Sequence, residues 1–123
     1  YMLAIKGLPD GDYSIAADGR ALGKWPAAKL AEGVDLASAT ANGWEPGGPW
    51  EAAAWALADA TEARSELGQV APGLAYHLPN SPVVADLKAR AREADARLEE
   101  VQRTLVAPRP FRFVVERAPE AAR

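Results

Sequence analysis

The sequence predicts an α+β fold in which a small antiparallel sheet carries a long antiparallel helical hairpin. Three observations lead to this class. Short apolar and β-branched runs, separated by Pro-Asp-Gly and Asp-Gly turns, fill the first 25 residues. Two stretches with apolar residues at helical spacing follow, over 50–70 and 81–106. A last apolar run over 111–117 predicts a strand that returns to the sheet.

The first 37 residues contain most of the predicted sheet. Strands are expected over 1–6, 13–17 and 20–25, and these form a three-stranded antiparallel meander. Pro9 and Gly11 suit the first connection, because one fixes φ and the other frees it. Asp18-Gly19 is a typical two-residue hairpin turn. A two-turn helix over 26–32 begins at Pro26 and ends at Gly33, and 34–37 is an extended edge segment.

The stretch 38–49 predicts a surface loop. It contains three glycines and two prolines around Trp44. Backbone of this composition does not continue a helix or a strand. We expect Trp44 to hold the loop against the rest of the chain.

The first helix of the hairpin is predicted over residues 50 to about 70. Pro72-Gly73 should end it, which leaves 74–80 as a connector. One face carries small or apolar residues, with one arginine among them: Ala53, Leu57, Ala60, Arg64 and Leu67. A partner helix can therefore approach closely on this side.

The second helix, 81–106, has a clear heptad pattern. Ser81 or Asn80 can cap its start, Pro82 suits the first helical position, and Pro108 stops it. Apolar residues recur at alternating steps of three and four: Val84, Leu87, Ala91, Ala94, Leu98, Val101 and Leu105. This spacing predicts one narrow apolar stripe that needs a partner. Acidic residues four positions before arginines add support on the solvent side.

Length and composition limit the classes of function. The chain has 123 residues, which suits one domain, predicted over 1–117, with a tail over 118–123. Its net charge of -3 argues against a nucleic-acid partner, and the lack of cysteine excludes disulfides and thiolate metal sites. No apolar run is long enough to span a membrane, and no signal peptide is present. The direct start on an apolar strand suggests a piece of a longer precursor.

No catalytic, cofactor or metal site is predicted. His77 is the only histidine, and no serine lies in a Gly-x-Ser-x-Gly elbow. One histidine without cysteine makes a zinc site improbable. Three aspartates near the first turns, Asp10, Asp12 and Asp18, lack the spacing of a calcium loop, and Gly43, Gly47 and Gly48 are not followed by the Gly-Lys-Ser/Thr of a phosphate loop. The chain should therefore act through its surfaces.

An interaction surface is predicted from exposed aromatic residues and apolar strands. The four tryptophans could stack on sugars, but filling an alanine-rich core explains them better. Trp55 lies off the Leu57 face, so it is the tryptophan expected to meet a partner. The predicted surface comprises Trp55, Trp44, Tyr76, His77, Tyr1, Leu3, Ile5, Phe111, Phe113 and Val115.

Both ends of the chain resemble a known family. The run Gly7-Leu8-Pro9-Asp10-Gly11-Asp12-Tyr13, followed by Asp18-Gly19, resembles a segment found after the catalytic domain of bacterial SGNH (GDSL-type) hydrolases from a Planctomycetes-like group. Residues 30–37 are similar to that group's Leu-Ala-x-Gly-Val-Asn-Leu-Ala, and 107–113 to its terminal strand. These proteins are typically exported.

The family's catalytic blocks are absent from this sequence. There is no Gly-Asp-Ser, no Gly-x-Asn-Asp and no Asp-x-x-His. The resemblance therefore implies a periplasmic or extracellular accessory region whose partner is an upstream catalytic domain. The alternative is a binding or self-assembling module, a subunit of a homo-oligomer or filament, that uses strands 1–5 and 111–115 and the heptad stripe. A stand-alone enzyme is the least favoured class.

Overall fold

The computed structural model describes residues 1–120 and divides them into two compact units. The first, which we call the sheet unit, contains Tyr1–Ala52 together with the chain from Arg109 onward. The second, the hairpin unit, is Ala53–Pro108. The α+β class is confirmed, with antiparallel sheets and a hairpin of two long helices. The prediction that 1–117 is a single domain stays a prediction.

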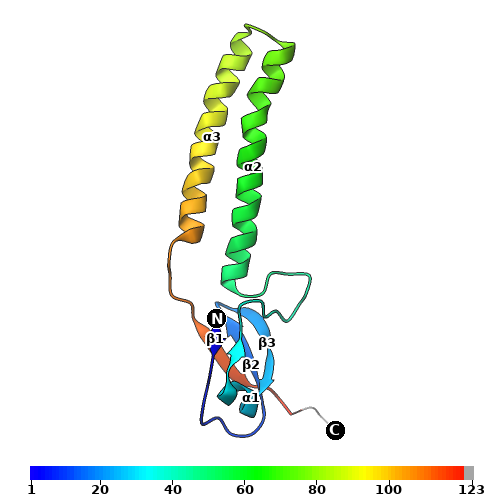
Figure 1. The fold of residues 1–123 in the computed structure, drawn as a ribbon, viewed down its shortest axis with the longest axis vertical. Coiled ribbons are helices and arrows are strands. Elements are labelled where there is room, and N and C mark those ends of the chain that lie inside the picture. The colour runs from blue at the N-terminus through cyan, green and yellow to red at the C-terminus, as the bar shows by residue number, and fades with distance from the viewer. Residues whose placement is uncertain (121–123) are drawn as a thin grey trace. The chain divides into compact units, whose positions relative to one another are not determined.

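The main sheet of the sheet unit has three antiparallel strands in the order β3-β2-β5 (Figure 1). These are β2 (Asp12–Ala17), β3 (Arg20–Pro26) and β5 (Phe113–Arg117). The turn between β2 and β3 uses Asp18 and Gly19, both at positive φ, as a type I′ hairpin turn requires. The predicted return of the last strand is confirmed, because β5 pairs with β2 along its length.

The first strand does not join this sheet, which corrects the predicted meander. Instead β1 (Met2–Leu3) pairs with β4 (Val34–Asp35) in a separate two-stranded sheet. The second edge of β2 is occupied by β5, whose Val115 packs against the core. The first segment is held instead by backbone hydrogen bonds from Ile5 to Leu30 and from Leu36 to Tyr1.

The hydrophobic core lies on one face of the main sheet. Alternation along β2 buries Tyr13, Ile15 and Ala17, as a period of two requires. The predicted short helix is confirmed as α1 (Ala27–Glu32), and it places Leu30 in the core with no exposed surface. The remaining core residues come from β3, α1 and the segment around β4: Leu22, Ala27, Val34 and Leu36.

Asp18 ties the last strand to the hairpin turn. Its carboxylate accepts hydrogen bonds from the backbone N–H of Arg112 at 2.8 Å and from the Arg109 guanidinium at 2.7 Å. These donors stabilise the charged form, the backbone donor most, and they lower the pKa of Asp18. The predicted tail extends past residue 120 and so lies partly outside the described residues. Its first residue, Ala118, donates to the carbonyl of Asp12 at 2.8 Å.

We expect Asp18→Asn to make the free energy of unfolding depend less on pH in the acidic range. Asparagine tolerates positive φ as aspartate does, so the turn is kept while the charge is lost. Because the pKa of Asp18 is lower in the folded chain than in the unfolded chain, its stabilisation is present above about pH 4 and disappears as pH falls through the folded-state pKa. The variant should be less stable at neutral pH and lose less stability on acidification. Urea unfolding at a series of pH values measures this, and two parallel profiles would contradict it.

The hairpin unit consists of the body of α2 (Pro49–His77) and all of α3 (Pro82–Val106), which run antiparallel (Figure 1). The predicted start of α3 is confirmed: the hydroxyl of Ser81 accepts from the N–H of Val83 at 3.3 Å, and Pro82 occupies the first turn. The ion pairs expected along the outer face also form, Asp86 with Arg90 among them at 2.9 Å.

The first helix continues through Pro72, so its predicted end near residue 70 is wrong. It ends at His77, and the connector shrinks to 78–81. Pro72 removes only one helical hydrogen bond, the one that would reach the carbonyl of Gly68. Packing before and after Pro72 compensates, because Ala71 is buried and Leu74, three positions further along the same helix face, is half-buried. Continued packing of this face outweighs the local cost of proline.

The seam between the helices is partly polar. Arg64 makes a two-pronged contact with Asp95, at 2.7 and 3.1 Å, and also reaches the amide oxygen of Gln102 at 2.6 Å. The amide nitrogen of Gln102 donates to the hydroxyl of Thr61 at 2.8 Å. Arg64 lowers the pKa of Asp95, chiefly through this hydrogen bonding. A polar contact of this kind favours one register of the two helices over others.

The predicted stripe on α3 needs one correction. Val101 is 48% exposed, whereas Gln102 is half-buried and faces Thr61 of the other helix. A straight helix has 3.6 residues per turn, so a strict seven-residue repeat drifts across its face. By the last turns the drift favours position 102 over 101, and Arg64 provides a polar partner there.

Candidate interaction surface

Aromatic rings in the sheet unit gather around Trp50. We call this group, Tyr1, Trp50, Phe111 and Phe113, the aromatic cluster. The Trp50 ring lies 4.7 Å from that of Tyr1, 5.5 Å from Phe111 in an edge contact and 6.2 Å from Phe113, measured between centroids. These separations and tilts are typical of favourable aromatic pairs. Residues from both ends of the sequence and from its middle thus form one surface.

Prolines and side-chain contacts hold the rings of the aromatic cluster in place. Pro49 begins the helix one residue earlier, and the indole N–H of Trp50 donates to the carbonyl of Ala37 at 2.7 Å. Pro110 keeps the chain before Phe111 extended. The Arg109 guanidinium lies 4.7 Å from the Phe111 ring centroid, in a cation–π contact. Because the same guanidinium pairs with Asp18, the cluster borders an ion pair.

The aromatic cluster remains open to solvent. Tyr1 is 62% exposed and Phe113 is 39% exposed. Three other predicted surface residues of this unit pack against the hydrophobic core instead: Leu3, Ile5 and Val115. Of the six residues predicted on the first and last strands, three belong to the aromatic cluster and three support the sheet beneath it.

Trp44 does not hold down its loop, contrary to the expectation. It is 92% exposed. The loop is held by polar contacts: Arg20 donates to the carbonyls of Pro46 and Gly47, at 2.7 and 2.8 Å, and the Glu51 carboxylate accepts from the N–H of Gly47 at 2.8 Å. Glycine-rich backbone offers free carbonyls, and a guanidinium can bind two of them at once.

The interaction residues predicted in the hairpin unit lie at two separate positions along α2. Trp55 is 50% exposed near one end of α2, while Tyr76 is 84% exposed in its last turn, with His77 in edge contact at 5.2 Å. At 1.5 Å per residue, Trp55 and Tyr76 lie about 30 Å apart along the helix. They do not make one site.

Two features of these surfaces were missed in the sequence. Trp50 is not among the predicted surface residues, yet it is the centre of the aromatic cluster. Its place directly after Pro49, in the first turn of a long helix, is a signal for a side chain that packs against the residues before the helix. Arg64 was placed on the inner face without a partner. An arginine among alanines and leucines on an inner face predicts an acidic partner on the facing helix. In the structure this partner is Asp95.

The described residues contain neither a cluster of metal ligands nor a helix that could cross a membrane. Within 1–120, no three histidine, cysteine or acidic side chains come together as metal ligands would. No helix in that range has the length and apolarity to cross a bilayer. Comparisons with protein-family models, with curated proteins and with solved structures find no match. The resemblance to SGNH hydrolases therefore rests on the quoted motifs alone.

Proposed function

We propose that the chain is a non-catalytic accessory module of an exported, esterase-type protein of the SGNH class. In this proposal the sheet unit adjoins an upstream catalytic domain and supports it. The motifs at both ends of the sequence support the family, and the lack of its catalytic blocks supports the accessory role. A fold alone does not carry a function, so the site must supply the argument.

The aromatic cluster is the observation that carries this proposal. An upstream domain would be joined at Tyr1, whose ring contacts Trp50 and is 62% exposed. Aromatic residues and arginine are enriched at the centres of protein interfaces, and Arg109 lies beside these rings. An upstream domain that covered these rings would remove their apolar surface from water at the junction of the two domains.

The first test is the composition of the native polypeptide. Intact mass and peptide mapping should reveal a longer chain with Gly-Asp-Ser and Asp-x-x-His blocks before Tyr1. The purified 123-residue chain should hydrolyse p-nitrophenyl acetate no faster than buffer, with or without His77→Ala. Turnover that follows the purified chain would contradict the accessory role.

The second test addresses the cluster within that longer protein. Phe113→Ser should lower the melting temperature of the catalytic domain by several degrees, because it removes part of the docking surface. Trp44→Ser is the matched control, since Trp44 is also aromatic and is 92% exposed outside the cluster. Equal melting temperatures for Phe113→Ser and wild type would contradict docking at this surface.

Self-assembly is the second candidate, and β5 favours it. This strand pairs with β2 on one side, and within residues 1–120 no strand pairs with its other side. Open strand edges bind further strands through backbone hydrogen bonds. Light scattering after gel filtration over a range of concentrations distinguishes the two. Val115→Pro is the test variant, because Val115 lies between the residues of β5 that hydrogen-bond to β2 and its N–H points to the open edge. Growth in mass that Val115→Pro abolishes supports assembly, and a constant monomer mass contradicts it.

A further inference from the structure

The end of the hairpin where α2 passes into α3 is apolar and exposed. No aspartate, glutamate, lysine or arginine lies between Glu66 and Asp86. We call residues 70–83 the hairpin tip. Four of its large apolar side chains are exposed: Val70 at 43%, Tyr76 at 84%, Leu78 at 47% and Val83 at 62%.

The seam does not account for these side chains. At this end of the hairpin it already uses Ala71 and Val84, each 7% exposed. Tyr76, Leu78 and Val83 belong to the last turn of α2, the connector and the first turn of α3, so they surround the end of the hairpin. The end of a helix pair, each helix about 10 Å across, is narrow and convex. A stable protein interface needs about 800 Å² on each partner, which such an end provides poorly.

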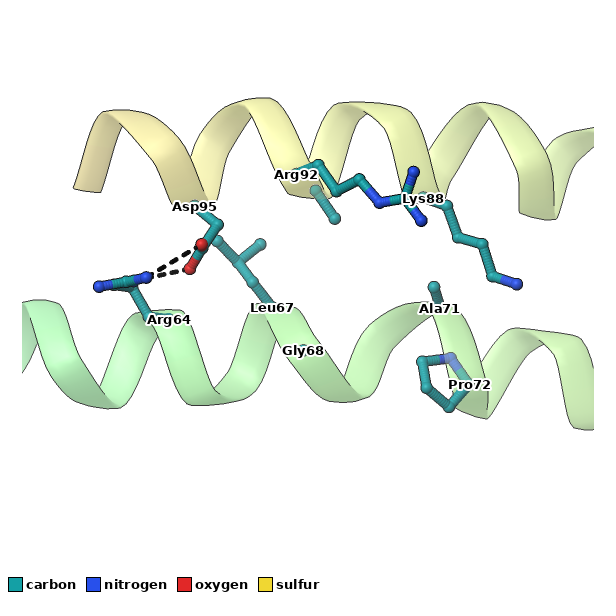
Figure 2. A pocket seen from close by; sticks show the side chains of 9 residues that line it. Arg64, Leu67, Gly68, Ala71, Pro72, Lys88, Arg92 and Asp95 are labelled. Atoms are coloured by element: carbon teal, nitrogen blue, oxygen red, sulfur yellow. Dashed lines mark hydrogen bonds and ion pairs between the residues drawn. The ribbon is translucent and has the colours of Figure 1, made fainter. Parts of the chain in front are cut away.

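Two free cations follow the tip on α3. Arg90 is paired with Asp86, but Lys88 and Arg92 form no ion pair with any residue of 1–120. Both side chains line a groove between the helices (Figure 2). Its volume is about 450 Å³, and its walls include Gly68, Ala71 and Ala91. The small side chains leave the groove open, so both cations stay accessible to an anion from solvent.

The distance between the tip and the cations matches the depth of a membrane interface. At 1.5 Å per residue, Lys88 lies about 9 Å and Arg92 about 15 Å beyond Pro82 along α3. Interfacial segments bury their apolar side about 5–10 Å into the boundary between headgroups and acyl chains. Lysine and arginine extend their charged ends toward lipid phosphates from such a depth. Tyrosine is enriched at this same level.

We propose that the hairpin tip inserts into the headgroup region of an anionic lipid bilayer. Tyr76, Leu78 and Val83 enter the boundary of the acyl chains, and Lys88 and Arg92 bind lipid phosphates. The positive charge of these two side chains favours an anionic surface. The convex tip suits a fluid bilayer, whose lipids can rearrange around it. This peripheral attachment is independent of the accessory role proposed above.

Vesicle flotation tests the apolar part of the proposal. The full chain should float with vesicles of phosphatidylglycerol and phosphatidylcholine (30:70) and remain below with pure phosphatidylcholine. Val83→Ser should weaken binding several-fold, and Tyr76→Ser with Leu78→Ser should abolish it. Val106→Ser is the matched control, because Val106 is equally exposed, at 62%, at the other end of α3. Circular dichroism confirms that each variant keeps its helices.

Charge substitutions test the phosphate contacts. Lys88→Gln with Arg92→Gln should weaken binding about 30-fold, because each cation near an anionic surface contributes roughly a five-fold gain. Arg97→Gln with Arg103→Gln changes the net charge equally, but these arginines lie further from the tip and pair with Glu93 and Glu99. If the two double variants lost the same amount of vesicle binding, net charge alone would explain the loss. That result would overturn the assignment of Lys88 and Arg92 as the phosphate contacts.

A single-cysteine label measures insertion itself. The chain has no cysteine, so Val83→Cys and Val106→Cys each accept one environment-sensitive fluorophore. With the anionic vesicles, emission from position 83 should shift to the blue and brighten, while position 106 should not change. No shift at position 83, or the same shift at both positions, overturns insertion by the tip. Failure of the full chain to float with anionic vesicles overturns the proposal as a whole, whatever the outcome for the accessory role.

Discussion

Leu30→Ala should lower the free energy of unfolding of the sheet unit by about 2–5 kcal/mol, the range for truncating a fully buried leucine. Leu30 has no exposed surface, and its backbone carbonyl also accepts from Ile5. The sheet unit has a small core, so the cavity has few neighbours that could close it. A loss of this size is a large part of the total stability of a small unit. Urea unfolding followed by tryptophan fluorescence measures it.

Met2→Ala is the matched control for this substitution. It removes a similar volume of apolar side chain from the same unit, but Met2 is 73% exposed. We expect a change within about 0.5 kcal/mol, as for most surface positions. Equal effects at the two positions would contradict the placement of Leu30 at the centre of the core.

Trp50→Ala should destabilise the sheet unit by about 2–4 kcal/mol, somewhat less than a fully buried tryptophan because the side chain is only half-buried. It removes three ring contacts and the hydrogen bond to Ala37. Those contacts join the start of the chain, the entry to α2 and the return to β5. Their loss should therefore also raise hydrogen exchange in β5. Thermal unfolding and amide exchange measure the two effects.

The same change at Trp44 gives an internal comparison. Trp44 and Trp50 are six positions apart, yet Trp44 is 92% exposed. Trp44→Ala should leave the free energy of unfolding unchanged within about 0.5 kcal/mol. If Trp44→Ala proved as costly as Trp50→Ala, the polar anchoring of the loop through Arg20 would be wrong.

The hairpin unit has little core of its own. Among its described residues only Ala60, Ala71 and Val84 are buried apolar side chains. Two helices with one thin seam gain little stability from packing, so local features carry more weight. The Ser81 cap, the outer ion pairs and the Arg64–Asp95 contact are such features. A unit of this kind gains from any surface that covers it, which is consistent with attachment at its tip.

Much of the fold could be predicted from the sequence, because its signals are local. Asp18-Gly19 and Ser81-Pro82 each specify a turn or a helix start through the φ angles and hydrogen bonds of a few neighbouring residues. The heptad of 81–106 likewise follows from the geometry of one helix. These features predict the hairpin turn and the helix α3, and the structure confirms both.

Strand pairing, the length of α2 and the exposure of the tryptophans depend on the tertiary structure, because competing partners there outweigh local preference. The edge of β2 has room for one further strand, and β5 takes it, so β1 pairs with β4 instead. Pro72 is a strong local stop, but the helix continues past it, with Ala71 buried and Leu74 half-buried on one face. Trp44 and Trp50 have the same side chain, and only the positions of Ala37, Tyr1 and Phe111 assign one to solvent and the other to the aromatic cluster. In each case the outcome depends on residues distant in sequence, whose approach no local pattern encodes.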